Sequence, residues 1–119
     1  INPETPVSAL FPWLDEINEV LFMTVHPGFG GQEFMGEVVP SIAGLCRRLD
    51  GPGGARFQAL DIAVDGGINL RTVEAAAAAG ANAFVAGNAL YTARDMARDA
   101  ALMRSGAAAA FGRDVFPAA

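Results

Sequence analysis

The chain has 119 residues, of which 52% are hydrophobic, and this composition favours one small packed domain over an intrinsically disordered chain. Eight basic against thirteen acidic residues give a net charge of −5, without a basic cluster longer than Arg47-Arg48, which argues against nucleic acid as a partner. The longest apolar run, around residues 75–79, is far too short to span a membrane, and the single cysteine, Cys46, excludes an internal disulfide and leaves a reducing cytoplasm as the expected location.

The N-terminal segment, Ile1-Asn2-Pro3-Glu4-Thr5-Pro6, has no initiator Met, charged leader or apolar signal region, and it is typical of the middle of a chain. Thr5 followed by Pro6 predicts the start of a short helix, which Pro12 limits or kinks. Glu4 is interpreted as part of a solvated surface. We expect the buried face of this helix to contain Leu10, Phe11, Trp13, Leu14 and Ile17.

Three segments have the composition of strands in a parallel sheet. The first, from Glu19 to Val25, is nearly continuous in apolar residues, as expected for a strand that is covered on both faces. The second extends from Leu60 to Val64, and the third from Ala83 to Ala86.

A helical pattern follows each predicted strand. Apolar residues recur at spacings of three and four from Met35 to Leu49, and Cys46 falls within this pattern as a buried thiol. The second helix is expected from about Leu70 to Ala79, between a cap at Asn69 and a C-terminal Gly80. The third is expected from Ala93 to Met103.

Repeated strand–loop–helix units require parallel strands with right-handed crossovers. The sequence therefore predicts an α/β fold with three parallel βα units, which belong either to an open sheet or to an incomplete (β/α)8 barrel, because three strands cannot close one. Residues 1–104 form this unit, and residues 105–119 are expected to be a weakly patterned tail.

Three glycine-rich loops follow the carboxyl ends of the predicted strands, where parallel α/β folds bind their ligands. They contain Gly28, Gly30 and Gly31 in the first loop, Gly66 and Gly67 in the second, and Gly87 with Asn88 in the third. Backbone N–H groups in such loops can bind an anion, and a small phosphorylated substrate fits better than a nucleotide because a P-loop lysine and a GxGxxG motif are missing. The alternative is that these glycines only form tight turns.

Two titratable side chains lie at predicted strand ends. Asp65 can transfer a proton or bind a divalent cation, or else its carboxylate only makes a local turn or cap. His26 is the only histidine, and a single histidine of this kind is more often a hydrogen-bonded structural residue than a ligand.

The segment Leu21–Gln32, with the sequence LFMTVHPGFGGQ, resembles the signature strand and loop of ribulose-phosphate 3-epimerases. Val64-Asp65-Gly66-Gly67-Ile68 resembles a second signature of the family, and residues 79–89 are similar to its last strand and phosphate turn. The N-terminal segment is similar to the one that leaves the family's fifth strand. The match runs from Ile1 to about Arg104, with His26 in place of a common Asn and Asn88 in place of a common Ser.

The resemblance implies the C-terminal portion of a TIM barrel from a cytoplasmic enzyme of the pentose phosphate pathway. The enzyme would interconvert D-ribulose 5-phosphate and D-xylulose 5-phosphate by proton transfer at C3 between two Asp residues, assisted by a divalent cation (Fe2+, Mn2+, Zn2+ or Co2+), and would be a homo-oligomer at full length. Asp65 matches one catalytic Asp, which is also a metal ligand. The implied substrate- and phosphate-binding residues are Gly28, Phe29, Gly30, Gly31, Asp65, Gly66, Gly67, Gly87 and Asn88.

The family's other metal ligands and its partner Asp lie on early strands that this chain does not contain. We therefore expect the 119 residues alone to be inactive, since one carboxylate is too few ligands for a catalytic metal. Two alternatives stay open at this point: an epimerase of a ketohexose phosphate such as allulose 6-phosphate, and a non-catalytic half-barrel that binds phosphate.

Overall fold

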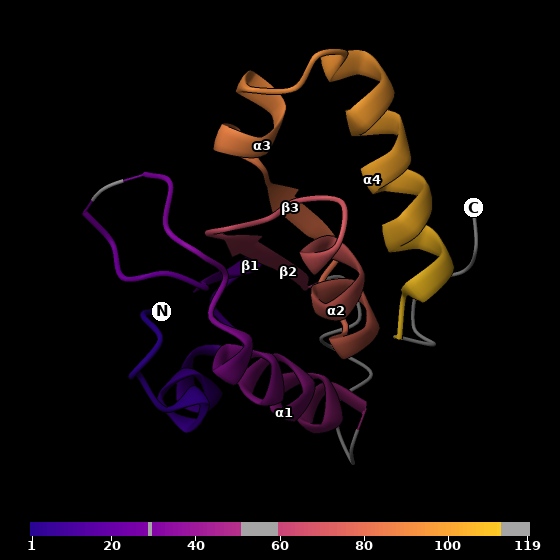
Figure 1. Ribbon diagram of the computed structural model, residues 1–119. Coiled ribbons are helices and arrows are strands. Elements are labelled where there is room, and N and C mark those ends of the chain that lie inside the picture. Colours follow the sequence, from indigo (N-terminus) through magenta and orange to yellow (C-terminus); the bar gives the residue numbers. More distant parts are fainter. Residues whose placement is uncertain (29, 51–59, 113–119) are drawn as a thin grey trace.

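The computed structural model describes residues 1–28, 30–50 and 60–112, which form a small sheet with helices packed beside it (Figure 1). The elements in chain order are the 3-10 helix η1 (Val7–Trp13), β1 (Glu19–Met23), η2 (Gly36–Val38), α1 (Val39–Asp50), β2 (Asp61–Asp65), α2 (Thr72–Ala79), β3 (Ala83–Val85), α3 (Gly87–Tyr91) and α4 (Met96–Ala110).

The sheet consists of three parallel strands in the order β1-β2-β3, so β2 is central. Met23 pairs with Asp65, and Asp65 pairs with Val85, which aligns the carboxyl ends of all three strands. The predicted α/β architecture with successive parallel βα units is confirmed, and the sheet is open, as expected for an incomplete barrel.

The hydrophobic core lies on one face of this sheet. Phe22 and Val64 are buried there with Ile42 of α1 and Val73 of α2, each at most 1% exposed. The expectation that β1 is covered on both faces is wrong, because its residues alternate between exposed and buried. In the described part of the chain, no element packs on the second face, where Leu21 is 38% and Val85 49% exposed.

Local signals explain where the helices begin and end. The α1 helix has the predicted amphipathic pattern, with Leu45, Cys46 and Leu49 buried. Before α2, the side-chain oxygen of Asn69 accepts hydrogen bonds from the backbone N–H groups of Arg71 (2.9 Å) and Thr72 (3.0 Å), as a cap should. The same helix ends at Gly80 as predicted, with φ of +121°.

The first helix differs from its prediction. It is a 3-10 helix that contains Pro12, and Trp13 is 56% exposed instead of buried. A 3-10 helix has three residues per turn, so a face assigned from α-helical spacing drifts away from the core along its length. Leu14, immediately after the helix, is buried as expected.

The C-terminal helical region also differs from its prediction. Two helices replace the one expected from Ala93 to Met103, and α4 begins where the Asp95 side chain accepts a hydrogen bond from the Arg98 N–H group (2.9 Å). The expected tail is helical as far as Ala110, because Ala107 is buried against the core and alanine strongly favours helix. Residues 113–119 of that tail lie outside the described residues.

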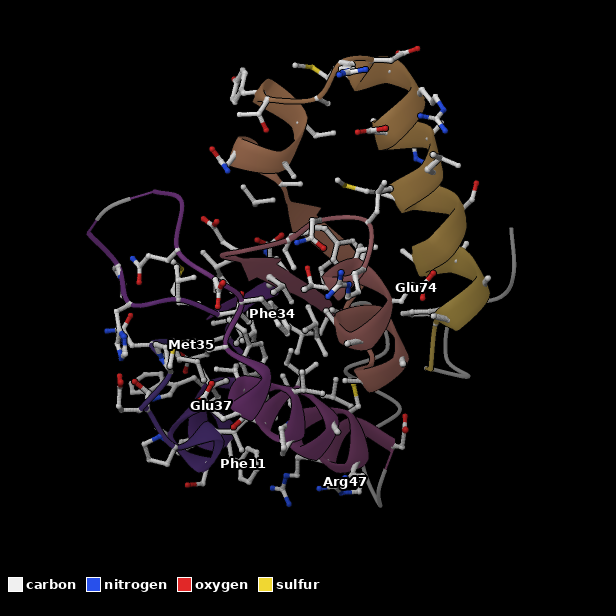
Figure 2. All side chains as sticks on the ribbon, viewed as in Figure 1. Phe11, Phe34, Met35, Glu37, Arg47 and Glu74 are labelled. Atoms are coloured by element: carbon white, nitrogen blue, oxygen red, sulfur yellow. The ribbon has the colours of Figure 1, made fainter. Side chains whose placement is uncertain are left out.

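The packing of α4 on α2 involves small residues. Gly106 of α4 faces Glu74 of α2, and a Cβ atom at position 106 would lie 3.2 Å from the Glu74 carboxylate (Figure 2). Among the helices that the structure describes, none is long and apolar enough to cross a lipid bilayer.

Because the core lies on one face of the sheet, substitution of two valines by alanine should lower the free energy of unfolding by different amounts. We expect Val64→Ala to lower the free energy of unfolding by about 2 kcal/mol, because its side chain is fully buried, and Val85→Ala to change it by less than about 0.5 kcal/mol. Urea denaturation of both variants measures this difference. Similar losses for the two would show that the second face is covered in solution.

Candidate functional site

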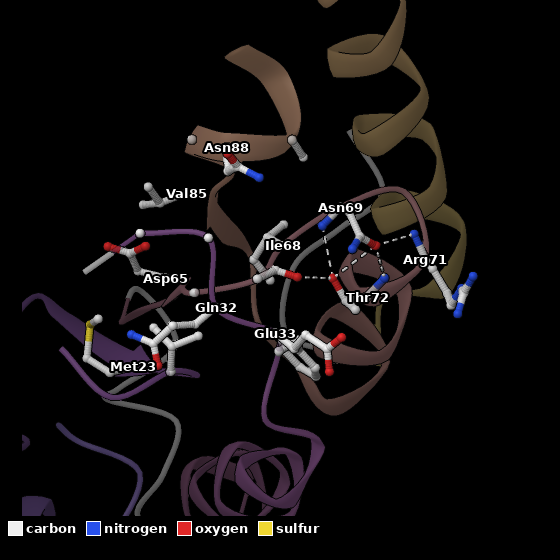
Figure 3. A pocket seen from close by; sticks show the side chains of 18 of the residues that line it. Met23, Gln32, Glu33, Asp65, Ile68, Asn69, Arg71, Thr72, Val85 and Asn88 are labelled. Atoms are coloured by element: carbon white, nitrogen blue, oxygen red, sulfur yellow. Dashed lines mark hydrogen bonds between the residues drawn. The ribbon is translucent and has the colours of Figure 1, made fainter. Parts of the chain in front are cut away.

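The loops that follow the three strands surround one cavity at the carboxyl edge of the sheet (Figure 3). Its volume is about 970 Å³, which is ample for a small-molecule ligand. The lining contains eight of the nine residues that the sequence singled out: Gly28, Gly30, Gly31, Asp65, Gly66, Gly67, Gly87 and Asn88. The ninth, Phe29, lies outside the described residues.

Asp65 is the last residue of the central strand, and its half-buried carboxylate lies at the cavity (Figure 3). Its backbone carbonyl oxygen accepts a hydrogen bond from the Thr24 N–H group (2.9 Å). Its side chain makes no hydrogen bond or ion pair within the described residues, so the alternative of a carboxylate that caps a local turn is not what the structure shows. The carboxylate is available to a ligand.

The fold itself requires glycine at positions 66 and 67, independently of any ligand. Both have positive φ, of +132° and +67°, and the loop after β1 lies directly against them. A Cβ atom at position 66 would lie 2.7 Å from a Val25 methyl group, and one at position 67 would lie 2.3 Å from the Phe34 backbone nitrogen. The Thr24 hydroxyl, which is fully buried, donates a hydrogen bond to the Gly66 carbonyl oxygen (2.6 Å) and fastens the two loops together.

The glycines of the other two loops are different. Gly30 and Gly87 have ordinary φ values, and a Cβ atom at either position would meet nothing within 4 Å. Gly28 and Gly31 have positive φ, which favours glycine, but the space beside them is also open. Nothing in the described chain therefore requires glycine at positions 30 and 87, whereas a ligand that approaches the backbone closely would.

His26 is hydrogen-bonded, which agrees with the structural interpretation of this residue. Its Nε2 atom contacts the Glu4 Oε1 atom, and its backbone carbonyl oxygen accepts a hydrogen bond from the Gln32 side-chain amide (2.6 Å). The contact with His26, ahead of a backbone hydrogen bond at Glu4 itself, lowers the pKa of the Glu4 carboxyl below its ordinary value. Glu4 is thus more than part of a solvated surface.

Sequence reasoning overlooked Thr24 and Glu4, which lie outside the cavity lining and hold the lining residues Gly66 and His26 in place. Thr24 could have been found, because a hydroxyl inside an apolar run must find a hydrogen-bond partner when buried. Glu4 could not, because it is separated from His26 by 22 positions of sequence, and only the fold brings the two together.

The described residues do not form a metal site by themselves. They contain no group of three His, Cys, Asp or Glu side chains that could hold a cation. Asp65 alone supplies one carboxylate, which is fewer ligands than a catalytic metal requires.

A parallel βα layer whose strand ends carry glycine-rich loops, with a carboxylate that is unpartnered among the described residues, is the arrangement in which barrel enzymes bind small molecules. The chain belongs to the ribulose-phosphate 3-epimerase family, whose model matches residues 1–91. This finding confirms the resemblance carried by the segments around Leu21–Gln32 and Val64–Ile68.

Individual relatives carry the same name. The chain is 43% identical over 94 residues to the ribulose-phosphate 3-epimerase of Schizosaccharomyces pombe, with 79% of this chain and 38% of the relative covered. It is 45% identical over 91 residues to that of Bacillus subtilis, with 76% and 41% covered. For that of Mycobacterium tuberculosis strain H37Rv, the identity is 39% over 110 residues, with 92% and 46% covered. The chain spans less than half the length of these relatives.

The two kinds of glycine predict different responses to one added methyl group. Gly67→Ala should lower the free energy of unfolding by about 2–4 kcal/mol, because it combines an unfavourable backbone conformation with a clash against Phe34. Gly30→Ala should change it by less than about 0.5 kcal/mol. Thermal or urea unfolding tests both, and equal losses would contradict the distinction.

The contact between Glu4 and His26 predicts a pH effect. Because the pKa of Glu4 is lowered in the folded chain, the contact stabilises the folded state above the ordinary pKa of a glutamate and is lost as the pH falls through the lowered value. In His26→Ala, the Glu4 pKa should rise toward its ordinary value. A titration followed by the Glu4 carboxyl ¹³C signal measures it, and an identical midpoint in both proteins would refute the contact.

Proposed function

We propose that this chain forms the part of a ribulose-phosphate 3-epimerase that holds the phosphate of the substrate and one of the two catalytic acid–base groups. The substrates would be D-ribulose 5-phosphate and D-xylulose 5-phosphate. The observation that carries the proposal is the carboxylate of Asp65, which lies unpartnered among the described residues at a cavity bordered by three glycine-bearing loops.

Asp65 is suited to proton transfer. It ends the central strand, so its backbone is held by pairing with both neighbouring strands, and only its side chain is free to meet a substrate. Inversion at C3 requires that a proton leave one face of the carbon and return on the other. A single carboxylate reaches one face, so a second acid–base group is needed on the opposite face of the carbon.

The phosphate would be held mainly by backbone N–H groups. Gly30 and Gly87 leave open space at the cavity, and Asn88 beside it can donate from its side-chain amide (Figure 3). The net charge of −5 offers no general attraction for an anion, so local donors must supply it.

Metal dependence is a trait that the family resemblance implies, with Asp65 as one ligand of a divalent cation. The described residues supply no further ligand cluster, so the remaining ligands of such a cation would lie outside this chain. The role of Asp65 that this chain itself supports is proton transfer. A cytoplasmic location of the enzyme is supported by a relative from Oryza sativa that is named as the cytoplasmic isoform.

Measurements can distinguish the proposed function from two alternatives, a ketohexose-phosphate epimerase and a non-catalytic phosphate-binding protein. The proposed phosphate site would be shared by both substrates and would not discriminate sugar length, so kcat/KM for ribulose 5-phosphate against allulose 6-phosphate in the intact enzyme distinguishes a pentose from a hexose epimerase. A non-catalytic phosphate-binding role is favoured for the isolated chain because the described residues contain no group of three side chains that could hold a metal.

We expect the purified 119-residue chain to bind inorganic phosphate without turning over ribulose 5-phosphate, even with added Mn2+. Phosphate should shift the amide NMR signals of Gly30, Gly87 and Asn88 and leave those of Ile62 and Gly106, which are outside the cavity lining, unchanged. A coupled assay for xylulose 5-phosphate measures turnover.

Either of two results would contradict this expectation. Robust turnover would show that Asp65 needs no partner from outside the chain. Phosphate-induced shifts that avoid all three cavity residues would remove the proposed anion site.

A further inference from the structure

The loop after β1, described at residues 24–28 and 30–35, is held by backbone and hydroxyl contacts at its two ends. At its start, Thr24 is fastened to Gly66, and at its end the Met35 N–H group donates to the Thr24 carbonyl oxygen (2.8 Å). The Phe34 side chain, next to Met35, packs against the hydrophobic core (Figure 2). Between these ends, the glycines at positions 28, 30 and 31 have no atom within 4 Å of a Cβ position, so packing does not fix these three glycines.

Polar contacts of Gln32 and His26 hold the described residues of this part of the loop. The Gln32 side chain bridges the loop by donating to the His26 carbonyl oxygen, and the His26 ring is held from outside the loop by Glu4. Because the His26 Nε2–H group can donate in either the neutral or the protonated ring, the contact with Glu4 does not depend on a charged histidine.

Glu4 is itself anchored to the sheet. The Met23 N–H group donates to the Ile1 carbonyl oxygen (2.9 Å), and the Thr5 N–H group closes a turn onto the Asn2 carbonyl oxygen (3.0 Å). Ile1 therefore lies along the free edge of β1, and the turn that carries Glu4 follows directly. The loop is thus tied to a segment whose own position is set by the strand that precedes the loop.

We propose that Glu4 is a positioning residue for the loop after β1: through His26, it holds the glycine-rich middle of that loop at the cavity before a ligand arrives. The inference rests on the proposed function, because that cavity is where the substrate's phosphate would bind. Glycine-rich segments lose much conformational freedom on ordering, so a contact that orders them beforehand improves affinity.

The position of the contact separates this role from a general stabilising one. The side chains of His26 and Glu4 are 56% and 68% exposed, and exposed pairs of this kind add little to global stability. The effect of Glu4 is therefore expected in the order of the loop and in the affinity for an anion, with unfolding almost unchanged.

The test compares four forms of the 119-residue chain by NMR: the unchanged protein, Glu4→Ala, Glu4→Gln and Glu16→Ala. Glu16→Ala is the matched control, since it removes the same charge from an exposed residue outside the cavity lining. In Glu4→Ala, the heteronuclear NOE of the Gly28, Gly30 and Gly31 amides should fall while that of strand β2 is unchanged. Glu4→Gln keeps an oxygen acceptor and should restore part of the order.

The same samples are titrated with inorganic phosphate at neutral pH. Glu4→Ala should weaken its binding roughly threefold or more, because a smaller fraction of the chain holds the loop in the competent conformation. In a His26→Ala background, Glu4→Ala should have no further effect, since the contact is already lost.

The outcomes distinguish this inference from the proposed function. Loop glycines that stay as ordered in Glu4→Ala as in the unchanged chain, or fully additive effects of Glu4→Ala and His26→Ala, would overturn the positioning role. Failure of phosphate to bind the unchanged chain would instead overturn the proposed anion site, while a loss of loop order in Glu4→Ala would still support the positioning of the loop.

Discussion

The site depends on the close crossing of two loops, in which the chain after β1 lies directly on Gly66 and Gly67. Any side chain at position 67 would intersect the Phe34 backbone, and the Thr24 hydroxyl closes the contact by donating to the Gly66 carbonyl oxygen. This crossing fixes where the first loop leaves the sheet. It also leaves the Asp65 carboxylate, one residue earlier, at the mouth of the cavity that both loops border.

The core lies on only one face of the sheet among the described residues. Helices α1 and α2 cover one face, and the second face carries exposed Leu21 and Val85 together with Asp65 at its carboxyl end. In a closed barrel that second face would be the interior. Under the proposed function, a second acid–base group that faces Asp65 across the substrate would come from that interior.

Glycines with similar sequence contexts have different physical roles. Gly66 and Gly67 answer a steric demand of the fold itself, whereas Gly30 and Gly87 border open space. The turn interpretation is therefore confirmed for Gly66 and Gly67, whereas the ligand interpretation stays a prediction for Gly30 and Gly87. Gly28, Gly30 and Gly31 have no packing neighbours, and in the proposed positioning role the contact of Glu4 with His26 restrains the loop that contains them.

The sequence by itself determined the three parallel βα units, the amphipathic α1, the Asn69 cap, the Gly80 helix end and the placement of Asp65 beside glycine-bearing loops. These features follow from local spacing and capping, which act over a few residues. Tertiary structure alone decided that β1 is covered on one face, that Trp13 is exposed, that α4 continues to Ala110 and that Glu4 meets His26. Each of these depends on which distant part of the chain packs against the segment. The apolar composition of β1 suits a barrel strand that is covered on both faces, so this composition alone does not reveal which face is covered in the described residues.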